Sequence, residues 1–160
     1  MGQRLDYFDD PAAPAANSVK PSAAAFVLRD GKLLLTQRSD NGNWSMPGGA
    51  HDPGESLTRT ATRETLEETG ISVRPTEVAG IYTDPRHVVH YTSNDEVRQE
   101  FTIVYRAEYV SGEAATSSET TRVEWVPVNQ LDDLTMDRSQ RMRIEWALNH
   151  TGTWIDPIGD

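Results

Sequence analysis

Apolar residues occur along this chain in short runs that are separated by turn-forming residues. Two such runs, Ala23–Arg29 and Leu33–Gln37, are joined by Asp30 and Gly31, which both tolerate a positive φ. This pattern predicts a hairpin that opens a β-sheet. Further strands are predicted where β-branched and aromatic residues alternate in part with polar ones, over Ile71–Tyr82, Phe101–Val110 and Thr121–Val128.

Two segments have the pattern of helices. Ser56–Thr69 consists mostly of helix-compatible residues, with Ser56 as a plausible N-cap and Gly70 as the terminator. Asp137–Asn149 carries apolar residues at helical spacing, and its arginines at 138, 141 and 143 are expected to form a solvated basic face. Together the elements predict an α/β fold around a sheet that is mixed or partly antiparallel.

The two ends of the chain are expected to lie outside the main domain. Residues 1–22 are rich in Pro, Ala and Asp and are predicted to form an extended arm, with Tyr7 and Phe8 as anchors onto the body. The domain is expected to span residues 23–152, and residues 153–160 a short C-terminal tail.

Two polar segments are predicted to be loops. Asp40–Gly54 is dense in turn formers, and loops of this length are often functional. Thr83–Glu100 holds His87 and His90, whose spacing of three sends them to opposite faces of an extended segment, so that one of them can face a cleft.

Length, charge and cysteine usage restrict the function. A chain of 160 residues fits one domain, and its net charge of −10 argues against a partner that is a nucleic-acid polymer. A small anionic substrate is compatible with this charge if cations mediate its binding. The absence of cysteine excludes disulfides, zinc–thiolate sites and cysteine nucleophiles. Without about 18 consecutive apolar residues, no membrane span is expected, and the protein is predicted to be soluble and cytoplasmic.

The candidate chemistry lies in the first predicted helix. Glu64, Glu67 and Glu68 crowd toward one side of this helix, and Glu64 and Glu68 continue the stripe that begins with Leu57 and Ala61. Buried carboxylates without partners are very unfavourable, so such a group either shares protons or binds a hard divalent cation. A solvated acidic face is the alternative that this spacing leaves open.

The residues around these glutamates resemble the signature of the Nudix (MutT-like) hydrolase family. That signature is a glycine, five residues, a glutamate, seven residues and then R-E-U-x-E-E-x-G-U, where U is a bulky apolar residue. One position departs from it, since Thr65 occupies the first U. A W-x-x-P-G-G approach at Trp44–Gly49 is also similar to the family. The matching residues are Gly49, Glu55, Arg63, Glu64, Glu67, Glu68, Gly70 and Ile71.

The resemblance implies an α/β/α sandwich around a mixed β-sheet and a set of metal ligands. Glu64, Glu67, Glu68 and the carbonyl of Gly48 are the expected ligands of Mg²⁺, with Mn²⁺ able to substitute. Glu64 is alternatively the general base.

The resemblance also implies roles for three residues around these ligands. Arg63 is expected to orient the carboxylates, and Glu55 to fix the loop onto the helix. Glu119, in a later polar loop, is the candidate for a further base or ligand, with Glu96 and Glu100 as competitors.

Four residues outside the signature are candidates for contacting the substrate. Arg38, Arg86 and Arg98 can bind phosphate if their loops converge, because arginine suits bidentate phosphate contacts. Trp44 either stacks on a base or packs its own loop down.

The expected activity is hydrolysis of the pyrophosphate linkage of a small nucleoside-diphosphate derivative. The substrate is left open between nucleoside triphosphates and ADP-ribose or nucleotide sugars, because the signature handles only the diphosphate. The alternative is a Nudix domain that binds a nucleotide or a partner protein without hydrolysis. A homodimer is a further expectation, with the arm exchanged between subunits.

Overall fold

The computed structural model describes residues 2–157; the first residue of the expected arm and the last three of the expected tail lie outside it. No helix in these residues is long and apolar enough to cross a membrane. The helices are α1 (Leu57–Thr69), the 3₁₀ helix η1 (Val128–Asp133) and α2 (Arg138–Asn149). The strands are β1 (Arg4–Phe8), β2 (Ser18–Val19), β3 (Ser22–Arg29), β4 (Lys32–Arg38), β5 (Trp44–Ser45), β6 (Gly48–Ala50), β7 (Ile71–Tyr82), β8 (His87–Tyr91), β9 (Glu96–Gln99), β10 (Thr102–Gly112), β11 (Thr120–Pro127) and β12 (Trp154–Ile155).

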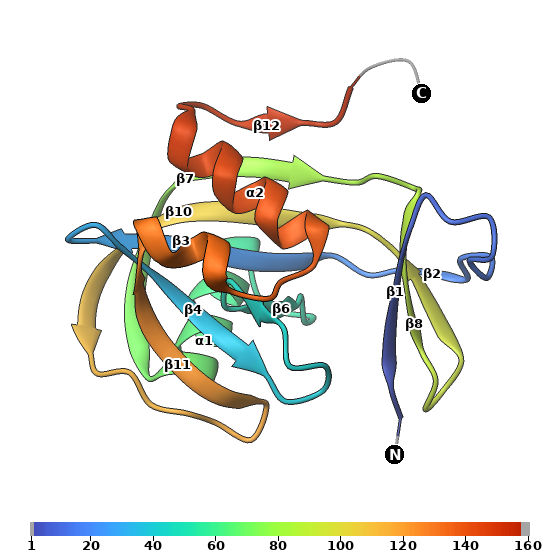
Figure 1. The fold of residues 1–160 in the computed structure, drawn as a ribbon, viewed down its shortest axis with the longest axis horizontal. Helices are drawn as coiled ribbons and strands as arrows, with labels where there is room; N and C mark the ends of the chain where they lie inside the picture. Colours follow the sequence, from blue (N-terminus) through green and yellow to red (C-terminus); the bar gives the residue numbers. More distant parts are fainter. Residues whose placement is uncertain (1, 158–160) are drawn as a thin grey trace.

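An eight-stranded mixed sheet forms the centre of the fold (Figure 1). Its main path is β11-β4-β3-β10-β7-β12, with β5 paired to β4 and β6 paired to β3. The β3–β10 and β7–β12 pairs are parallel and the others antiparallel. The predicted hairpin is confirmed: Asp30 and Gly31 have φ values of 51° and 73° between β3 and β4.

Helices α1 and α2 cover opposite faces of this sheet, as the alternation of side chains along β3 demonstrates. Ala24 and Phe26 belong to the core that includes Ile144 of α2, whereas Ala23 packs with Ala61 of α1. Successive side chains of a strand point to opposite faces, so one short strand supplies both cores. The predicted α/β/α sandwich is confirmed.

Helix α1 begins and ends where its sequence signals place it. The Ser56 hydroxyl accepts a hydrogen bond from the Arg59 amide at 3.2 Å, and Gly70 ends the helix with a φ of 76°. A left-handed terminal residue is most easily a glycine, because other residues meet a steric penalty there. The helix is therefore fixed at both ends by local chemistry.

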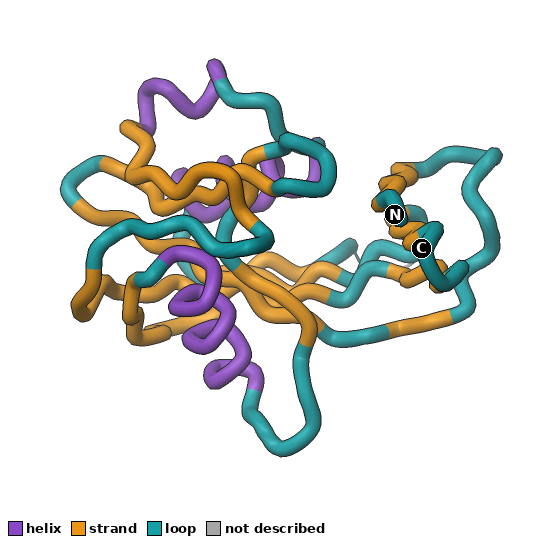
Figure 2. The backbone as a smooth tube through the Cα atoms, turned by 90° about the horizontal axis from the view of Figure 1, so that it is seen from below, coloured by secondary structure: helices purple, strands orange, loops and turns teal. Residues whose placement is uncertain are grey.

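A second sheet, of four strands in the order β1-β8-β9-β2, stands to one side of the main body (Figure 2). Its strands fall in the segments predicted to be an arm and a polar loop. The predictions missed them because the strands are only two to five residues long, and β1 and β9 also carry charged residues. Arg4 and Asp6 of β1 are partly buried because they pair with each other. In the expected tail, β12 pairs with β7, which the sequence analysis also missed.

A chain of buried charges joins the small sheet to the main body. The Glu100 Oε2 atom lies 2.6 Å from His87 Nδ1 and 2.7 Å from Arg143 Nη2, and His87 Nε2 lies 3.3 Å from Asp6. Burial disfavours a charged histidine, but Asp6 and Glu100 raise the pKa of His87. Burial also favours neutral Glu100, yet Arg143 and His87 hold the pKa of Glu100 at about 2. The expected solvated basic face of α2 is thus wrong for Arg143, which is buried.

We predict that Glu100→Gln lowers the free energy of unfolding by about 3 kcal/mol, because it removes the buried negative charge that Arg143 and His87 share. Chemical denaturation measures this difference. The exposed pair between Arg74 and Glu108 supplies the control, since Glu108→Gln should cost less than about 1 kcal/mol. Equal losses in the two variants would contradict the importance of the buried chain.

A second prediction concerns the departure from the signature at Thr65. The Thr65 and Thr69 side chains are both fully buried. The Thr65 hydroxyl donates a hydrogen bond to the Ala61 carbonyl, and the Thr69 hydroxyl donates one to the Thr65 carbonyl. Only the Thr69 hydroxyl also accepts a hydrogen bond, from the Ile71 amide. Thr65→Val should therefore leave stability nearly unchanged, whereas Thr69→Val should cost about 1 kcal/mol or more. Thermal unfolding of the two variants tests this; a larger loss for Thr65→Val would refute it.

Candidate active site

Two glycines of β6 allow the backbone to lie directly against α1 and β3. A Cβ atom on Gly49 would lie 2.4 Å from the carboxyl carbon of Glu64, and one on Gly48 would lie 2.6 Å from the Ala23 carbonyl oxygen. No other residue type fits these two positions without a shift of the neighbours. The close approach brings the Pro-Gly-Gly loop onto the acidic face of the helix.

The Arg63 guanidinium binds several acceptors around this contact. Its Nε and Nη2 atoms donate to both oxygens of Glu55, at 2.9 and 2.7 Å, and Nη2 also donates to the Ala50 carbonyl. Its Nη1 atom donates to Glu64 at 2.9 Å and to Glu67 at 3.2 Å. One planar cation thus links the loop to the helix and orients two carboxylates, in the arrangement expected for Arg63.

The Glu55 carboxylate accepts hydrogen bonds from its own loop as well as from helix α1. Its Oε1 atom accepts hydrogen bonds from the Thr60 hydroxyl at 2.9 Å and the Asp52 amide at 3.1 Å, in addition to the Arg63 pair. The bonds from Arg63 are the main reason that the pKa of Glu55 falls to about 2. A carboxylate held in this way is ionised near neutral pH and serves to position the loop rather than to accept a proton.

Glu64 and Glu68 project from α1 into a cleft of about 340 Å³. Burial raises the pKa of Glu64. Burial, together with the nearby Glu64 carboxylate, raises the pKa of Glu68 to about 8. Glu68 receives one long bond, from the Gly48 amide at 3.4 Å. Glu64 has one bond from Arg63, against two for Glu55, and Glu68 has no cationic partner among the described residues, so a bound cation would favour their ionised forms.

Glu67 differs from its two neighbours. Its side chain is 59% exposed, bonds to Arg63 and is not among the residues lining the cleft. Within residues 2–157, no three His, Cys, Asp or Glu side chains are placed to hold a metal by themselves. Glu64 and Glu68 do form a set of oxygen donors beside Gly48, which fits a hard cation such as Mg²⁺ whose remaining ligands come from the backbone, water or substrate.

Glu119 also lines the cleft, from the loop before β11. Its backbone carbonyl accepts bonds from the amide and the hydroxyl of Ser39, both at 3.1 Å, so the loop is tied to the end of β4. The Glu119 side chain is close enough to Glu64 and Glu68 to raise the pKa of each. Its predicted place near the helix glutamates agrees with this geometry.

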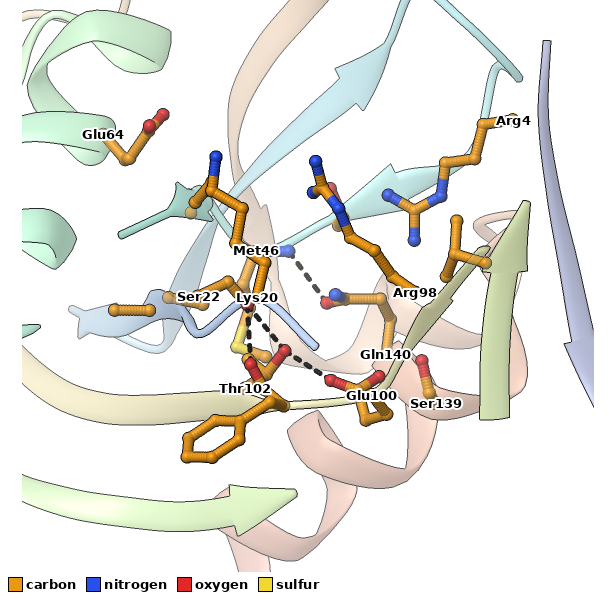
Figure 3. Close-up of a pocket in the computed structure, with 18 of the residues that line it drawn as sticks. Arg4, Lys20, Ser22, Met46, Glu64, Arg98, Glu100, Thr102, Ser139 and Gln140 are labelled. Atoms are coloured by element: carbon orange, nitrogen blue, oxygen red, sulfur yellow. Dashed lines mark hydrogen bonds between the residues drawn. The ribbon is translucent and has the colours of Figure 1, made fainter. Parts of the chain in front are cut away.

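The opposite part of the cleft is basic (Figure 3). Of the four residues predicted to contact substrate, Arg38 and Arg98 line this cleft. Arg86 does not: it bonds to Asp84 and lines a separate cavity beside α2. Trp44 is also misplaced by the prediction, because its side chain is 5% exposed and packs in the core below the loop. The alternative, that Trp44 packs its loop down, fits the structure.

Sequence reasoning missed four residues that line the same cleft: Arg4, Lys20, Gln140 and Arg143. Arg4 and Lys20 come from the segment expected to be an arm, and Gln140 and Arg143 come from α2. The one available signal was the isolated positive charge of Arg4 and Lys20 in an otherwise apolar and acidic N-terminal segment.

Comparisons with known proteins agree with this site. The model of the NUDIX domain matches residues 19–147. A MutT-like protein of Streptomyces ambofaciens is 34% identical over 155 residues, covering 94% of this chain and 92% of its own. A putative 8-oxo-dGTP diphosphatase of Bacillus subtilis is 32% identical over 111 residues, which cover 68% of this chain and 67% of that protein.

A solved structure supports the same fold. The crystal structure of an ADP-ribose pyrophosphatase from Streptococcus suis has a TM-score of 0.67 at 23% identity, over 87% of this chain and all of that one. Fold, signature geometry and relatives therefore agree: the chain belongs to the NUDIX domain family and is a hydrolase of pyrophosphate bonds.

Proposed function

We propose that this enzyme hydrolyses the pyrophosphate linkage of a nucleoside-diphosphate derivative in a Mg²⁺-dependent reaction. The observation that carries the proposal is the pair of carboxylates, Glu64 and Glu68, which face the cleft without a cation of their own beyond the contact of Glu64 with Arg63. The opposite wall of the same cleft carries positive charge. A diphosphate lies favourably between these walls only if cations screen it from the glutamates.

The proposed metal ligands are Glu64, Glu68 and the Gly48 carbonyl, with Mn²⁺ able to replace Mg²⁺. When bound, the metal supplies charge neutralisation at the phosphate oxygens and lowers the pKa of a bound water. Glu67 can join this set only by giving up its bond to Arg63. Arg63 and Glu55 position the ligands, because Arg63 contacts Glu64 directly and Glu55 holds Arg63.

Glu119 is the proposed general base, with Glu64 as its alternative. Both line the cleft, and Glu119 is exposed on a loop, where it can reach a water molecule. The competitors are less suited to take a proton. The Glu100 carboxylate is already bonded to His87, Arg143 and Thr102. The Glu96 carboxylate binds Arg98 through both oxygens.

Two substrate classes fit this site. A nucleoside triphosphate of the kind named for the B. subtilis relative and the ADP-ribose named for the S. suis structure both contain a phosphoric anhydride. ADP-ribose pyrophosphatases occur among the relatives by sequence as well as among the structures of similar fold, so the names alone favour neither class. A nucleotide-binding domain without hydrolysis is disfavoured, because none of the signature glutamates is lost.

Replacement of one ligand tests the metal site. Glu68→Gln keeps the shape of the side chain but removes its charge, so kcat should fall on the order of 100-fold while the melting temperature is retained or rises. Glu145→Gln, on the exposed side of α2 and outside the cleft, is the matched control and should retain full activity. Undiminished kcat for Glu68→Gln would mean that the metal site lies elsewhere.

Metal removal and a substrate panel test the reaction itself. Phosphate or pyrophosphate release should be measured with nucleoside triphosphates, ADP-ribose, nucleotide sugars and dinucleoside polyphosphates, with Mg²⁺ or with a chelator. At least one compound should be hydrolysed, and the chelator should abolish its turnover. If no compound is hydrolysed but one raises the melting temperature, the domain binds its ligand without cleaving it.

A further inference from the structure

The wall of the cleft that faces the signature glutamates is formed by the small sheet and by the residues directly after its strand β2. Arg4 of β1, Arg98 of β9 and Lys20, which comes directly after β2, all line the cleft. The two arginines lie on the far side from Glu64, and Lys20 lies between them and Glu64 (Figure 3). The protein as a whole carries a net charge of −10. A concentration of cations at one end of one cleft in such a protein is therefore a local feature of the fold rather than a general basic surface.

In each arginine of this wall, one edge of the guanidinium is hydrogen-bonded to a carboxylate and the other edge can still donate to an anion. Arg4 donates to Asp6 through Nε and Nη2, both at 3.0 Å, and Arg98 donates to Glu96 through the same two atoms, at 2.7 and 2.9 Å. Residues two apart on a strand share a face, so each carboxylate holds its arginine from the side. In the described part of the chain, the Nη1 atoms of both arginines have no hydrogen-bond partner.

Two further donors complete this wall. Lys20 is exposed and forms no ion pair within residues 2–157. Gln140 of α2 uses its side-chain oxygen to accept a bond from the Met46 amide at 3.1 Å, which leaves its NH₂ group for another acceptor. Lys20, Gln140 and the two Nη1 edges are all donors, whereas Glu64, Glu68 and Glu119 at the other end are all acceptors when ionised.

The donors are held in place by buried structure. Asp6, which binds Arg4, also contacts His87, and His87 is bound through Glu100 to Arg143 of α2. Arg98 is further fixed by its guanidinium, which lies 4.7 Å from the centre of the Tyr91 ring. Fixed donors bind an anion at a lower entropic cost than mobile surface side chains do.

We propose that this wall, which is defined by Arg4, Lys20, Arg98 and Gln140, is a second anion subsite. It binds a phosphate group of the substrate other than the two that flank the hydrolysed anhydride bond. This proposal rests on the proposed function and narrows its substrate class. A nucleoside triphosphate has a third phosphate for this subsite, whereas ADP-ribose has none beyond the two that flank its anhydride bond. The enzyme therefore prefers nucleoside triphosphates, or derivatives that are equally rich in phosphate, over ADP-ribose.

Binding of inorganic phosphate in the presence of a chelator tests the subsite without reference to catalysis. Calorimetric titration at low ionic strength should detect phosphate binding to the wild-type protein, and Lys20→Gln should weaken it about fivefold or more. The chain has one other lysine, Lys32, which is exposed at the β3–β4 hairpin and outside the cleft. Lys32→Gln should bind phosphate as the wild type does. No binding by the wild type, or the same affinity in both variants, would overturn the proposal.

Kinetics with dGTP and dGDP then test the link to substrate choice. The ratio of kcat/KM for dGTP to that for dGDP should exceed one in the wild type and in Lys32→Gln, and should fall several-fold in Lys20→Gln. An equal loss on both substrates would assign Lys20 to general attraction of anions and contradict the subsite. If neither compound is hydrolysed by the wild type, the proposed function fails on this substrate class, while the phosphate titration still decides whether the anion subsite exists.

Discussion

The contact of Arg63 with its carboxylate and carbonyl partners is the interaction on which the site depends. Helix α1 carries three glutamates within five residues, and an isolated helix would be destabilised by their repulsion. Arg63 offsets part of that repulsion by bonding to Glu64 and Glu67, and it uses its other edge to bind Glu55 and the backbone at Ala50. A lysine could not do this, because only the planar guanidinium presents parallel donors in a fixed arrangement.

The two walls of the cleft solve different parts of one electrostatic problem. The signature helix provides carboxylates whose pKa values are raised by burial, so that end of the cleft favours a metal cation. The small sheet provides cations whose charge is partly balanced by Asp6 and Glu96, so that end attracts anions without the cost of bringing bare positive charges together. A polyanionic substrate can then lie along the cleft, with a metal at one end and protein donors at the other.

The buried chain of charges links these walls. Glu100 receives bonds from His87 of the small sheet and Arg143 of the last helix, and the pair of cations outweighs the cost of burying its carboxylate. These ion pairs add to the contact of the Arg138 guanidinium of α2 with the Phe8 ring of β1. Asp6 holds the Arg4 side chain at the cleft and itself contacts His87. The position of Arg4 thus depends on a residue that lies more than 80 positions away in the sequence.

Local chemistry was enough to predict α1, its caps, the β3–β4 hairpin and the spacing of the signature glutamates, because each depends on residues within one or two turns of the chain. Ser56, Gly70, Asp30 and Gly31 act through their own backbone preferences, and the signature positions share one helix. The sequence by itself therefore determined the family, the fold class and the acidic half of the site.

The basic half was decided by the tertiary structure. Arg4, Lys20 and Arg98 meet only because β1 pairs with β8 and β2 pairs with β9. Strands of two to five residues carry too little hydrophobic periodicity to predict such pairings. Burial could not be predicted for Arg143 for the same reason: Glu100, which makes its burial favourable, comes from a distant segment. Long-range contacts, and not local propensity, thus decide which arginines line the cleft.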